Sequence, residues 1–167
     1  EFTYDTINPL INITSPLNNS NHSTRNVVIN ITMSDSGTGL STCLWSNNSG
    51  VVNNSFTCGT NITTINWLEE INNLTFWAND TLGNLNLSRV TFTTDTLPPV
   101  ATINTPSGAY TSLSVPFNVS MTDTLGFANC TAWVMRGASV EVANTSLICP
   151  SGNSGSVNGT ILVTGSA

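Results

Sequence analysis

The sequence repeats itself once, with a period of about 90 residues. Residues 2–9 (FTYDTINP) reappear as residues 92–99 (FTTDTLPP), which places Asp5 and Asp95 at an offset of 90. Later matches drift by two or three positions and pair Asp35 with Asp123 and Cys43 with Cys130. A period of this length is typical of tandem domains. We therefore expect two related domains.

The repeat is out of phase with the ends of the chain. Residues 1–6 match the end of a repeat, and the last repeat stops at Ala167, before the segment that would match residues 84–94. We therefore expect residues 1–6 to be the end of a preceding repeat or a donated strand, residues 7–96 to be domain 1, and residues 97–167 to be domain 2 without its final strand. Two prolines make the boundary a short, stiff joint.

Apolar and polar residues alternate along most of the chain. In one run, Val27, Ile29 and Ile31 share a face that Asn30 does not. A period of two favours β-strands, which we predict at residues 10–14, 26–34, 40–47, 51–57, 61–67, 72–79, 85–94, 100–104, 114–122, 128–136, 139–147 and 157–164. Seven short strands in the first domain indicate an immunoglobulin-like sandwich. The expected fold is all-β, with two tandem immunoglobulin-like β-sandwich domains.

Three short motifs resemble the immunoglobulin-like repeats of large prokaryotic cell-surface proteins. They are Asp-Thr-x-x-Pro at residues 5–9 and 95–99, an early Ser/Thr-Pro at 15–16 and 105–106, and NDTLGN at 79–84. The Asn-rich composition is similar to archaeal versions. The resemblance implies tandem arrays outside the cell with a structural or adhesive role, and it carries no catalytic residues. The second domain has no match to Asp80-x-x-Gly83-Asn84.

The charge of the chain excludes two classes of partner. It contains no lysine and three arginines, its net charge is −6 and its pI is near 4.2. Nucleic acids and anionic membrane surfaces both attract basic patches, so we expect neither as a partner. No apolar run approaches the roughly 20 residues of a transmembrane helix, and we expect no direct membrane insertion.

The four cysteines lie in corresponding places of the two repeats. Because each pair flanks one predicted hairpin, the repeat favours the pairings Cys43–Cys58 and Cys130–Cys149 among the three possible ones. A zinc site is the alternative, but there is no CxxC motif and a single histidine. Disulfides imply an oxidising, extracellular compartment.

The four tryptophans fall near the cysteines or on later strands. We expect Trp45, Trp67, Trp77 and Trp133 to pack in the cores, close to the disulfides. An exposed aromatic platform for sugars is the alternative.

Asn-x-Ser/Thr occurs fourteen times, about twice the number that chance gives for 24 Asn and 46 Ser or Thr residues. An outer strand face made of Asn and Thr produces such sequons without any glycan. N-linked glycans would, however, hydrate a surface that lacks lysine. Setting aside Asn129, which lies beside Cys130, the candidate sites are Asn12, Asn18, Asn21, Asn30, Asn47, Asn53, Asn61, Asn73, Asn79, Asn86, Asn118, Asn144 and Asn158.

No set of residues predicts catalysis. His22 lies in a polar segment and is expected to be solvated, while Glu69 and Glu70 would point to opposite faces of a strand. We expect no enzyme and no cofactor. Calcium is a weak alternative with the candidate ligands Asp35, Asp80, Asp95 and Asp123, although aspartates in turns commonly bond their own backbone.

The sequence therefore predicts a structural subunit or segment of an extracellular filament, stalk or surface layer, joined head to tail with other copies of itself and in contact with other surface components. The expected assembly strand consists of Glu1, Phe2, Thr3, Tyr4, Asp5 and Thr6, which would complete the second domain of a neighbour. Alternatively, one longer chain supplies the next repeat covalently. The competing function is an adhesin that binds glycans or proteins through loops 17–25 and 105–113.

Overall fold

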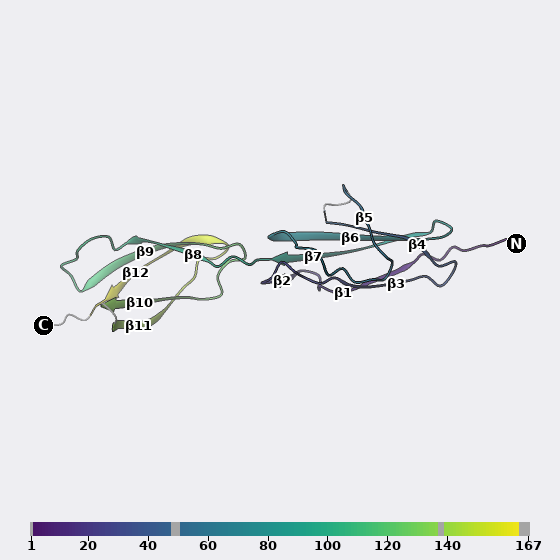
Figure 1. Ribbon diagram of the computed structural model, residues 1–167. Coiled ribbons are helices and arrows are strands. Elements are labelled where there is room, and N and C mark those ends of the chain that lie inside the picture. Colours follow the sequence, from purple (N-terminus) through teal and green to yellow (C-terminus); the bar gives the residue numbers. More distant parts are fainter. Residues whose placement is uncertain (1, 48–50, 137–138, 164–167) are drawn as a thin grey trace. The chain divides into compact units, whose positions relative to one another are not determined.

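The computed structural model describes residues 2–47, 51–136 and 139–163. Within these ranges, the side chains of residues 136–145 are not described. The chain divides into two compact units, Glu1–Thr96 and Leu97–Ala167. The described residues form strands and turns (Figure 1). Among them, no helix is long and apolar enough to cross a membrane. Each unit is described below by itself.

The first unit is a sandwich of two sheets. One sheet has the order β1-β3 and the other has the order β2-β7-β6-β4-β5. All neighbours run antiparallel except β2 and β7, which are parallel. This is the strand arrangement of an immunoglobulin-like sandwich. The strands are β1 (Leu10–Ser15), β2 (Ser20–His22), β3 (Asn30–Ser34), β4 (Leu40–Ser46), β5 (Asn54–Ser55), β6 (Glu70–Asp80) and β7 (Leu85–Thr94).

The core of the first unit lies between these sheets and depends heavily on β6 and β7. Trp67 is almost completely buried; its Nε1 donates to the carbonyl of Val27 at 2.7 Å, and its ring meets Phe92 edge to face. Each fully buried large apolar side chain contributes about 1.5–3 kcal/mol. Five of the eleven buried members of the core come from β6 and β7, namely Leu74, Phe76, Ala78, Val90 and Phe92.

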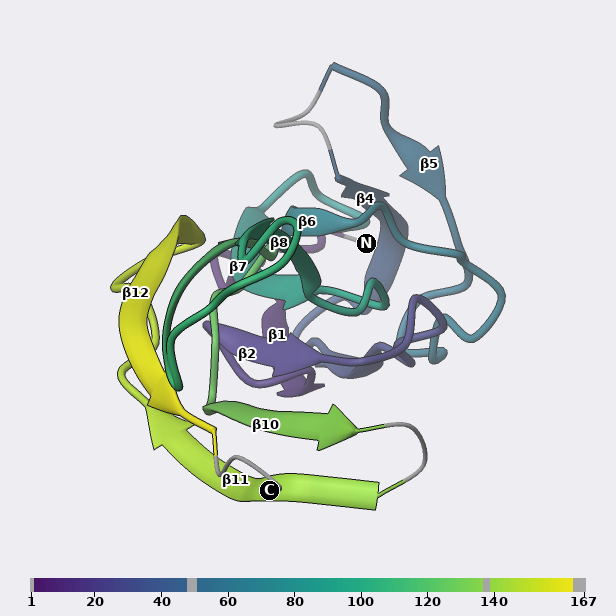
Figure 2. The same ribbon diagram turned by 90° about the vertical axis from the view of Figure 1, so that its left-hand side faces the viewer.

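The second unit repeats part of this arrangement. A sheet of order β12-β9-β8 is separate from the two-stranded sheet β10-β11, and Figure 2 shows β10 and β11 side by side. Strands β8 and β9 correspond to β1 and β3, and β10 and β11 correspond to β4 and β5. The strands are β8 (Val100–Thr105), β9 (Ser114–Thr122), β10 (Cys130–Arg136), β11 (Ser139–Leu147) and β12 (Ser154–Leu162).

The expected absence of a final strand from the second unit stays a prediction, and the described residues of the two units differ in their strands. Within residues 97–136 and 139–163, no strand corresponds to β6 or to β7. In the first unit, these two strands form a hairpin.

The strand predicted at residues 61–67 is wrong. Ile62 forms a single bridge with Ile29, with both backbone hydrogen bonds at 3.0 Å. On one side of this bridge, the Ile31 amide donates to the side-chain oxygen of Asn61 rather than to a backbone carbonyl. On the other side, the Trp67 amide donates to the carbonyl of Arg25. The following residues then carry Trp67 into the core. Of the strand predicted at residues 51–57, only β5 is formed.

Strand β2 was not predicted, because its residues are polar and show no alternation. Asn19, in a left-handed conformation, donates its amide to the carbonyl of Thr91, and β2 then pairs with β7. His22 of β2 is partly buried. Its ring lies edge-on to Phe92, and its Nε2 is 2.9 Å from the Ser20 hydroxyl.

Candidate functional site

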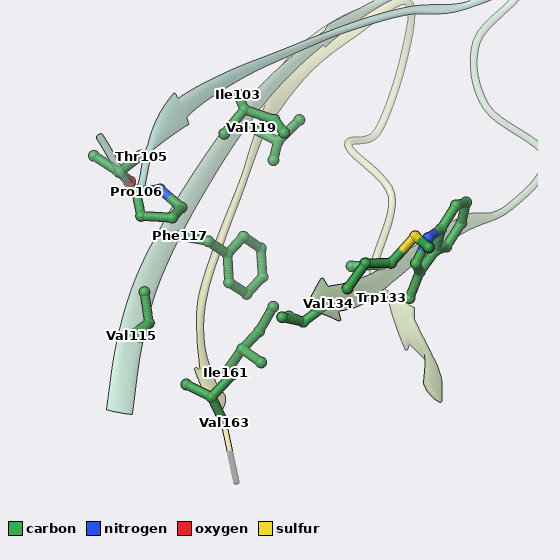
Figure 3. A pocket seen from close by; sticks show the side chains of 12 residues that line it. Ile103, Thr105, Pro106, Val115, Phe117, Val119, Trp133, Val134, Ile161 and Val163 are labelled. Carbon is green, nitrogen blue, oxygen red and sulfur yellow. The ribbon is translucent and has the colours of Figure 1, made fainter. Parts of the chain in front are cut away.

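The second unit carries an apolar groove of about 320 Å³ between β9–β12 and the hairpin β10–β11. Figure 3 shows Phe117 and Ile161 pointing from the sheet toward Val134 of β10. We call this surface the apolar groove. Its lining residues are Ile103, Thr105, Pro106, Val115, Phe117, Val119, Ala132, Trp133, Val134, Met135, Ile161 and Val163.

Strand alternation explains how the sequence builds this groove. On β9, Val115, Phe117 and Val119 occupy alternate positions and therefore share the inner face. In the pairing with β12, Val119 lies opposite Val157 and Val115 lies opposite Ile161. Phe117 lies opposite Gly159. A Cβ on Gly159 would lie 2.5 Å from the Phe117 ring. Glycine at this position lets the aromatic ring lie across β12.

The groove is the uncovered interior of a sandwich. The residues that correspond to Phe117 and Val119 are Ile29, just before β3, and Ile31 of β3, which are 0% and 1% exposed. Phe117 is 9% exposed and Val119 is only partly buried. Ile103 of β8 is 70% exposed. Among the residues that the structure describes, no strand lies over these side chains as β6 and β7 do in the first unit.

One edge of the hairpin is also open within the described residues. In the first unit, β4 pairs with β5 on one side and with β6 on the other. In the second unit, β10 pairs with β11, and no described strand pairs with its other edge. Backbone N–H and C=O groups at such an edge are available for another strand. The groove thus combines an apolar floor with a rim of hydrogen-bonding groups.

The first unit carries a separate cluster of three carboxylates, those of Asp5, Asp35 and Asp80. One oxygen of each lies within 4.8 Å of the others. Asp5 precedes β1, Asp35 follows β3 and Asp80 ends β6. Gly37 is needed beside them, because a Cβ at that position would lie 2.0 Å from an Asp5 oxygen.

Backbone and side-chain donors hold these carboxylates. Asp5 accepts hydrogen bonds from the Ile7 amide at 2.9 Å and from the Thr38 amide at 2.6 Å, and these bonds lower its pKa. Burial acts to raise the pKa of Asp80, but bonds from the side chain and amide of Asn84 and from the Leu82 amide outweigh it, so the pKa is lowered. Both groups are therefore held in the charged form.

The cluster includes two of the four calcium candidates. Asp35 and Asp80 belong to it, whereas the described residues place Asp95 and Asp123 in no such group. Asp35 Oδ1 is buried without a hydrogen-bond partner among the described atoms. Calcium takes six to eight oxygen ligands, of which three carboxylates would supply part. Asp5 was missed as a candidate, although the Asp-Thr-x-x-Pro motif marked its position.

Both expected disulfides are present. Cys43 and Cys58 are bonded with their Cα atoms 5.3 Å apart, and Cys130 and Cys149 with theirs 5.4 Å apart. No cysteine is free, so the alternative zinc site is wrong.

The tryptophans divide between core and surface. Trp67 is buried and meets Trp45 edge to face at 5.9 Å. The prediction that Trp133 packs in a core is wrong, since it is 54% exposed at the rim of the apolar groove. Trp45 follows Cys43 by two residues, whereas Trp133 follows Cys130 by three, the parity of the opposite strand face. Trp77, on β6, is partly buried.

The sequon asparagines occupy different environments. Some are well exposed on strands and loops, whereas Asn86 donates its Nδ2 to the carbonyl of Pro9 at 2.7 Å. The side chain of Asn118 bonds that of Asn158 across β9 and β12. Asn144 lies outside the residues whose side chains are described. The exposed sites are Asn12, Asn18, Asn21, Asn53, Asn61, Asn73 and Asn158, and the partly buried ones are Asn30, Asn47, Asn79, Asn86 and Asn118.

The proposed assembly strand divides into two parts. Glu1 lies outside the described residues, and residues 2–9 form no strand. Phe2 and Tyr4 are 90% and 76% exposed, whereas Asp5 is bound to its own unit. Of the two adhesin loops, residues 17–25 contain β2 and are tied to β7. Residues 105–113 contain no strand beyond Thr105.

Comparisons with known proteins identify no family for this chain. No protein-family model matches the chain, and no curated protein matches it. A solved structure of fibronectin(III)-like modules of CbhA from Clostridium thermocellum is similar to it, with 17% identity and a TM-score of 0.44. The alignment covers 88% of this chain and 77% of that chain. The assignment to immunoglobulin-like sandwiches rests on the strand order of the first unit.

Proposed function

We propose that this chain is a structural segment of an extracellular filament, stalk or surface layer built from immunoglobulin-like repeats joined head to tail. The observation that carries the proposal is the pair of related units, each with its own disulfide at the corresponding strand. Disulfides persist in oxidising compartments. Tandem repeats in which each unit has its own disulfide are suited to a linear array whose units resist unfolding.

The end of the first unit supports this role, because it is fixed to the unit rather than loose. The amide and hydroxyl of Thr96 donate to the two carboxylate oxygens of Glu69 at 3.1 and 2.6 Å, and the Thr96 hydroxyl bond is the main reason that the pKa of Glu69 is lowered. The Asp95 amide donates to the carbonyl of His22 at 2.9 Å. Residues 97–99 (LPP) follow directly, and prolines stiffen them further.

The polar outer faces support a glycosylated surface. Asn104 of β8 donates its Nδ2 to the hydroxyl of Ser120 on β9 at 2.6 Å, and Asn118 continues this polar row to Asn158. Such faces keep a lysine-free protein hydrated. N-linked glycans on the exposed sequons would extend this hydration.

Assembly would place each copy end to end with the next. Phe2 and Tyr4 are suited to such a contact, because they are large, apolar and exposed. The competing arrangement, in which one polypeptide carries the next repeat, leads to the same linear array. The adhesin remains the second candidate and would act through residues 105–113, where Tyr110 is 41% exposed.

Electron microscopy of native material tests the proposal. We expect thin polymers at the cell surface, labelled along their length by antibodies raised against the first unit. Alkylation of unreduced protein should modify no cysteine. Dispersed monomers that bind a glycan array would favour the adhesin, and free thiols in native material would contradict an extracellular role.

A further inference from the structure

We propose that Asn79 carries an N-linked glycan whose first sugar packs against the ring of Trp77 and covers apolar side chains on the outer face of the first unit. Sequons are glycosylated on secreted chains, so the inference rests on the extracellular role proposed above. It goes further by assigning one sequon and giving its glycan a structural role.

The outer face of the five-stranded sheet carries apolar side chains on three neighbouring strands. Successive residues of a strand point to opposite faces, and Phe76 and Ala78 of β6 are 0% exposed in the core. Trp77 therefore lies on the outer face, where Leu44 of β4 and Leu87 of β7 pair with it. Trp77 and Leu44 are partly buried, whereas Leu87 is 47% exposed. We call Leu44, Trp77 and Leu87 the outer row.

The sequon of Asn79 and Thr81 lies directly beside the outer row. Asn79 follows Trp77 by two positions on β6, and side chains at this spacing share a face of the strand. Across the hairpin, Asn79 pairs with Leu85, which is 57% exposed. A sugar attached to Asn79 therefore reaches the Trp77 ring along the strand and Leu85 across it.

The side-chain amide of Asn79 is oriented for attachment. Its Oδ1 accepts a hydrogen bond from the Thr42 amide at 3.0 Å, and no described residue accepts from its Nδ2. Because the glycan is attached through Nδ2, the bond from Thr42 is retained after modification. Asn86 of β7 differs, since its Nδ2 donates to the carbonyl of Pro9 at 2.7 Å.

The covalent step replaces one N–H bond of the Asn79 side chain. The donor is an oligosaccharide activated through its anomeric carbon on a lipid phosphate, and a transferase of the exporting cell brings it to the chain. Nδ2 forms a bond to the anomeric carbon and loses one proton. The bond from that carbon to the phosphate oxygen breaks, and the oxygen keeps the electron pair.

A tethered sugar is suited to cover the outer row. A pyranose ring has a face of C–H groups, which an aromatic ring with its negative face attracts, and its hydroxyl groups remain in water. Apolar side chains gathered on a surface lower solubility, and only 7% of the residues of this chain are charged. Attachment at Asn79 gives the sugar a high effective concentration at Trp77, so one stacked ring suffices, whereas a free sugar would need further contacts.

Peptide mapping of native material decides whether Asn79 is modified. We expect a glycan on the peptide that contains Asn79. A bare Asn79 would overturn the inference, and glycans found at Asn12 in the same material would leave the proposed role intact. Conversely, a modified Asn79 in material that forms no filament, stalk or surface layer would contradict the proposed role and leave the site standing.

A double-mutant cycle measures the contact between the sugar and Trp77. The full chain is secreted from a host whose N-glycans begin with N-acetylglucosamine, and it is trimmed enzymatically to that one sugar. Thr81→Ala removes the sequon and should lower the melting temperature of the first unit by about 4 °C, the effect of one ring contact in a domain of this size. In Trp77→Val, which keeps a strand-forming residue, the same change should lower it by no more than about 1 °C.

Thr14→Ala is the matched control, because it removes the sequon of Asn12. The hydroxyls of Thr14 and Thr81 each donate one hydrogen bond to a backbone carbonyl at 3.3 Å. Strands β1 and β3 contain no aromatic residue, so this variant should lose no more than about 1 °C. Equal losses in Thr81→Ala with and without the Trp77 ring, or an equal loss in Thr14→Ala, would overturn the contact.

Occupancy in the host is checked by mass before the cycle. A bare Asn79 beside a modified Asn12 counts against the inference, as it does in native material. A concentration-dependent dimer of the modified chain that disappears in Leu87→Ser would place a second copy on the outer row and contradict the glycan.

Discussion

Individual residues of the first unit decide where its polar groups can be buried. Asp80 is 1% exposed yet charged, because two amides and the Asn84 side chain donate to it. Asp5 lies next to it and is held by Thr38. The charge of Asp5 acts to raise the pKa of Asp80, so the cluster balances hydrogen bonding against repulsion.

The lowered pKa values of Asp5 and Asp80 predict an acid-sensitive first unit. Groups with a depressed folded-state pKa stabilise the fold above their ordinary value of 3.8, and this contribution is lost as the pH falls through the folded-state pKa. We expect the melting temperature of the first unit, measured in EDTA, to fall below about pH 4. In Asp80→Asn this fall should be smaller. An unchanged pH profile in the variant would contradict the assignment.

The same titration examines calcium, which stays a prediction. If the three carboxylates bind calcium, the ion should raise the melting temperature at neutral pH, and Asp35→Asn should remove the rise without touching the core. A melting temperature that is the same in EDTA and in calcium would contradict calcium binding and leave the aspartates with a role in turns alone.

At the scale of elements, a disulfide in each unit links one strand, β4 in the first unit and β10 in the second, to a segment that follows it in the chain. The Cys43–Cys58 bond links β4 to residues beyond β5, and Cys130–Cys149 links β10 to residues beyond β11. The disulfides therefore restrain the segments that leave β5 and β11.

Replacement of the first disulfide should destabilise the first unit markedly. The bond closes a loop of 15 residues, and in the chain-entropy model such a loop stabilises by about 3 kcal/mol. We expect Cys43→Ser/Cys58→Ser to lower the free energy of unfolding by about that amount in urea titrations. The paired variant Cys130→Ser/Cys149→Ser serves as the control, and it should leave the unfolding of the first unit unaltered.

At the scale of the whole molecule, solubility has to come from neutral polar groups, since only 7% of residues are charged. Asparagine, serine and threonine on the outer faces provide hydrogen bonds, and glycans on the exposed sequons, as proposed, would add to this hydration. The net charge of −6 adds some repulsion between copies.

Glycan occupancy should follow exposure. We expect native protein to have an intact mass above 17.6 kDa, with peptide mapping placing glycans on Asn12, Asn21, Asn53 and Asn73. Asn86 should be unmodified, because its Nδ2 donates to Pro9 inside the first unit. A bare mass, or a fully occupied Asn86, would count against this explanation of the sequons.

The sequence by itself determined the features that depend on local patterns. Alternation along the chain predicted β3, β4, β6, β7 and β9 because a period of two fixes which side chains share a face. The repeat predicted the disulfide pairs because corresponding cysteines recur in corresponding hairpins. Strand β2 escaped prediction, since polar residues joined the sheet through backbone bonds that carry no side-chain pattern.

Only the tertiary structure decided what depends on contacts distant in sequence. Asp5, Asp35 and Asp80 span 76 positions and meet because the sandwich brings three loops to one end. Ile103 of the second unit is 70% exposed, which the pattern of its own strand does not indicate. Burial is a property of the assembled sheets rather than of any single strand.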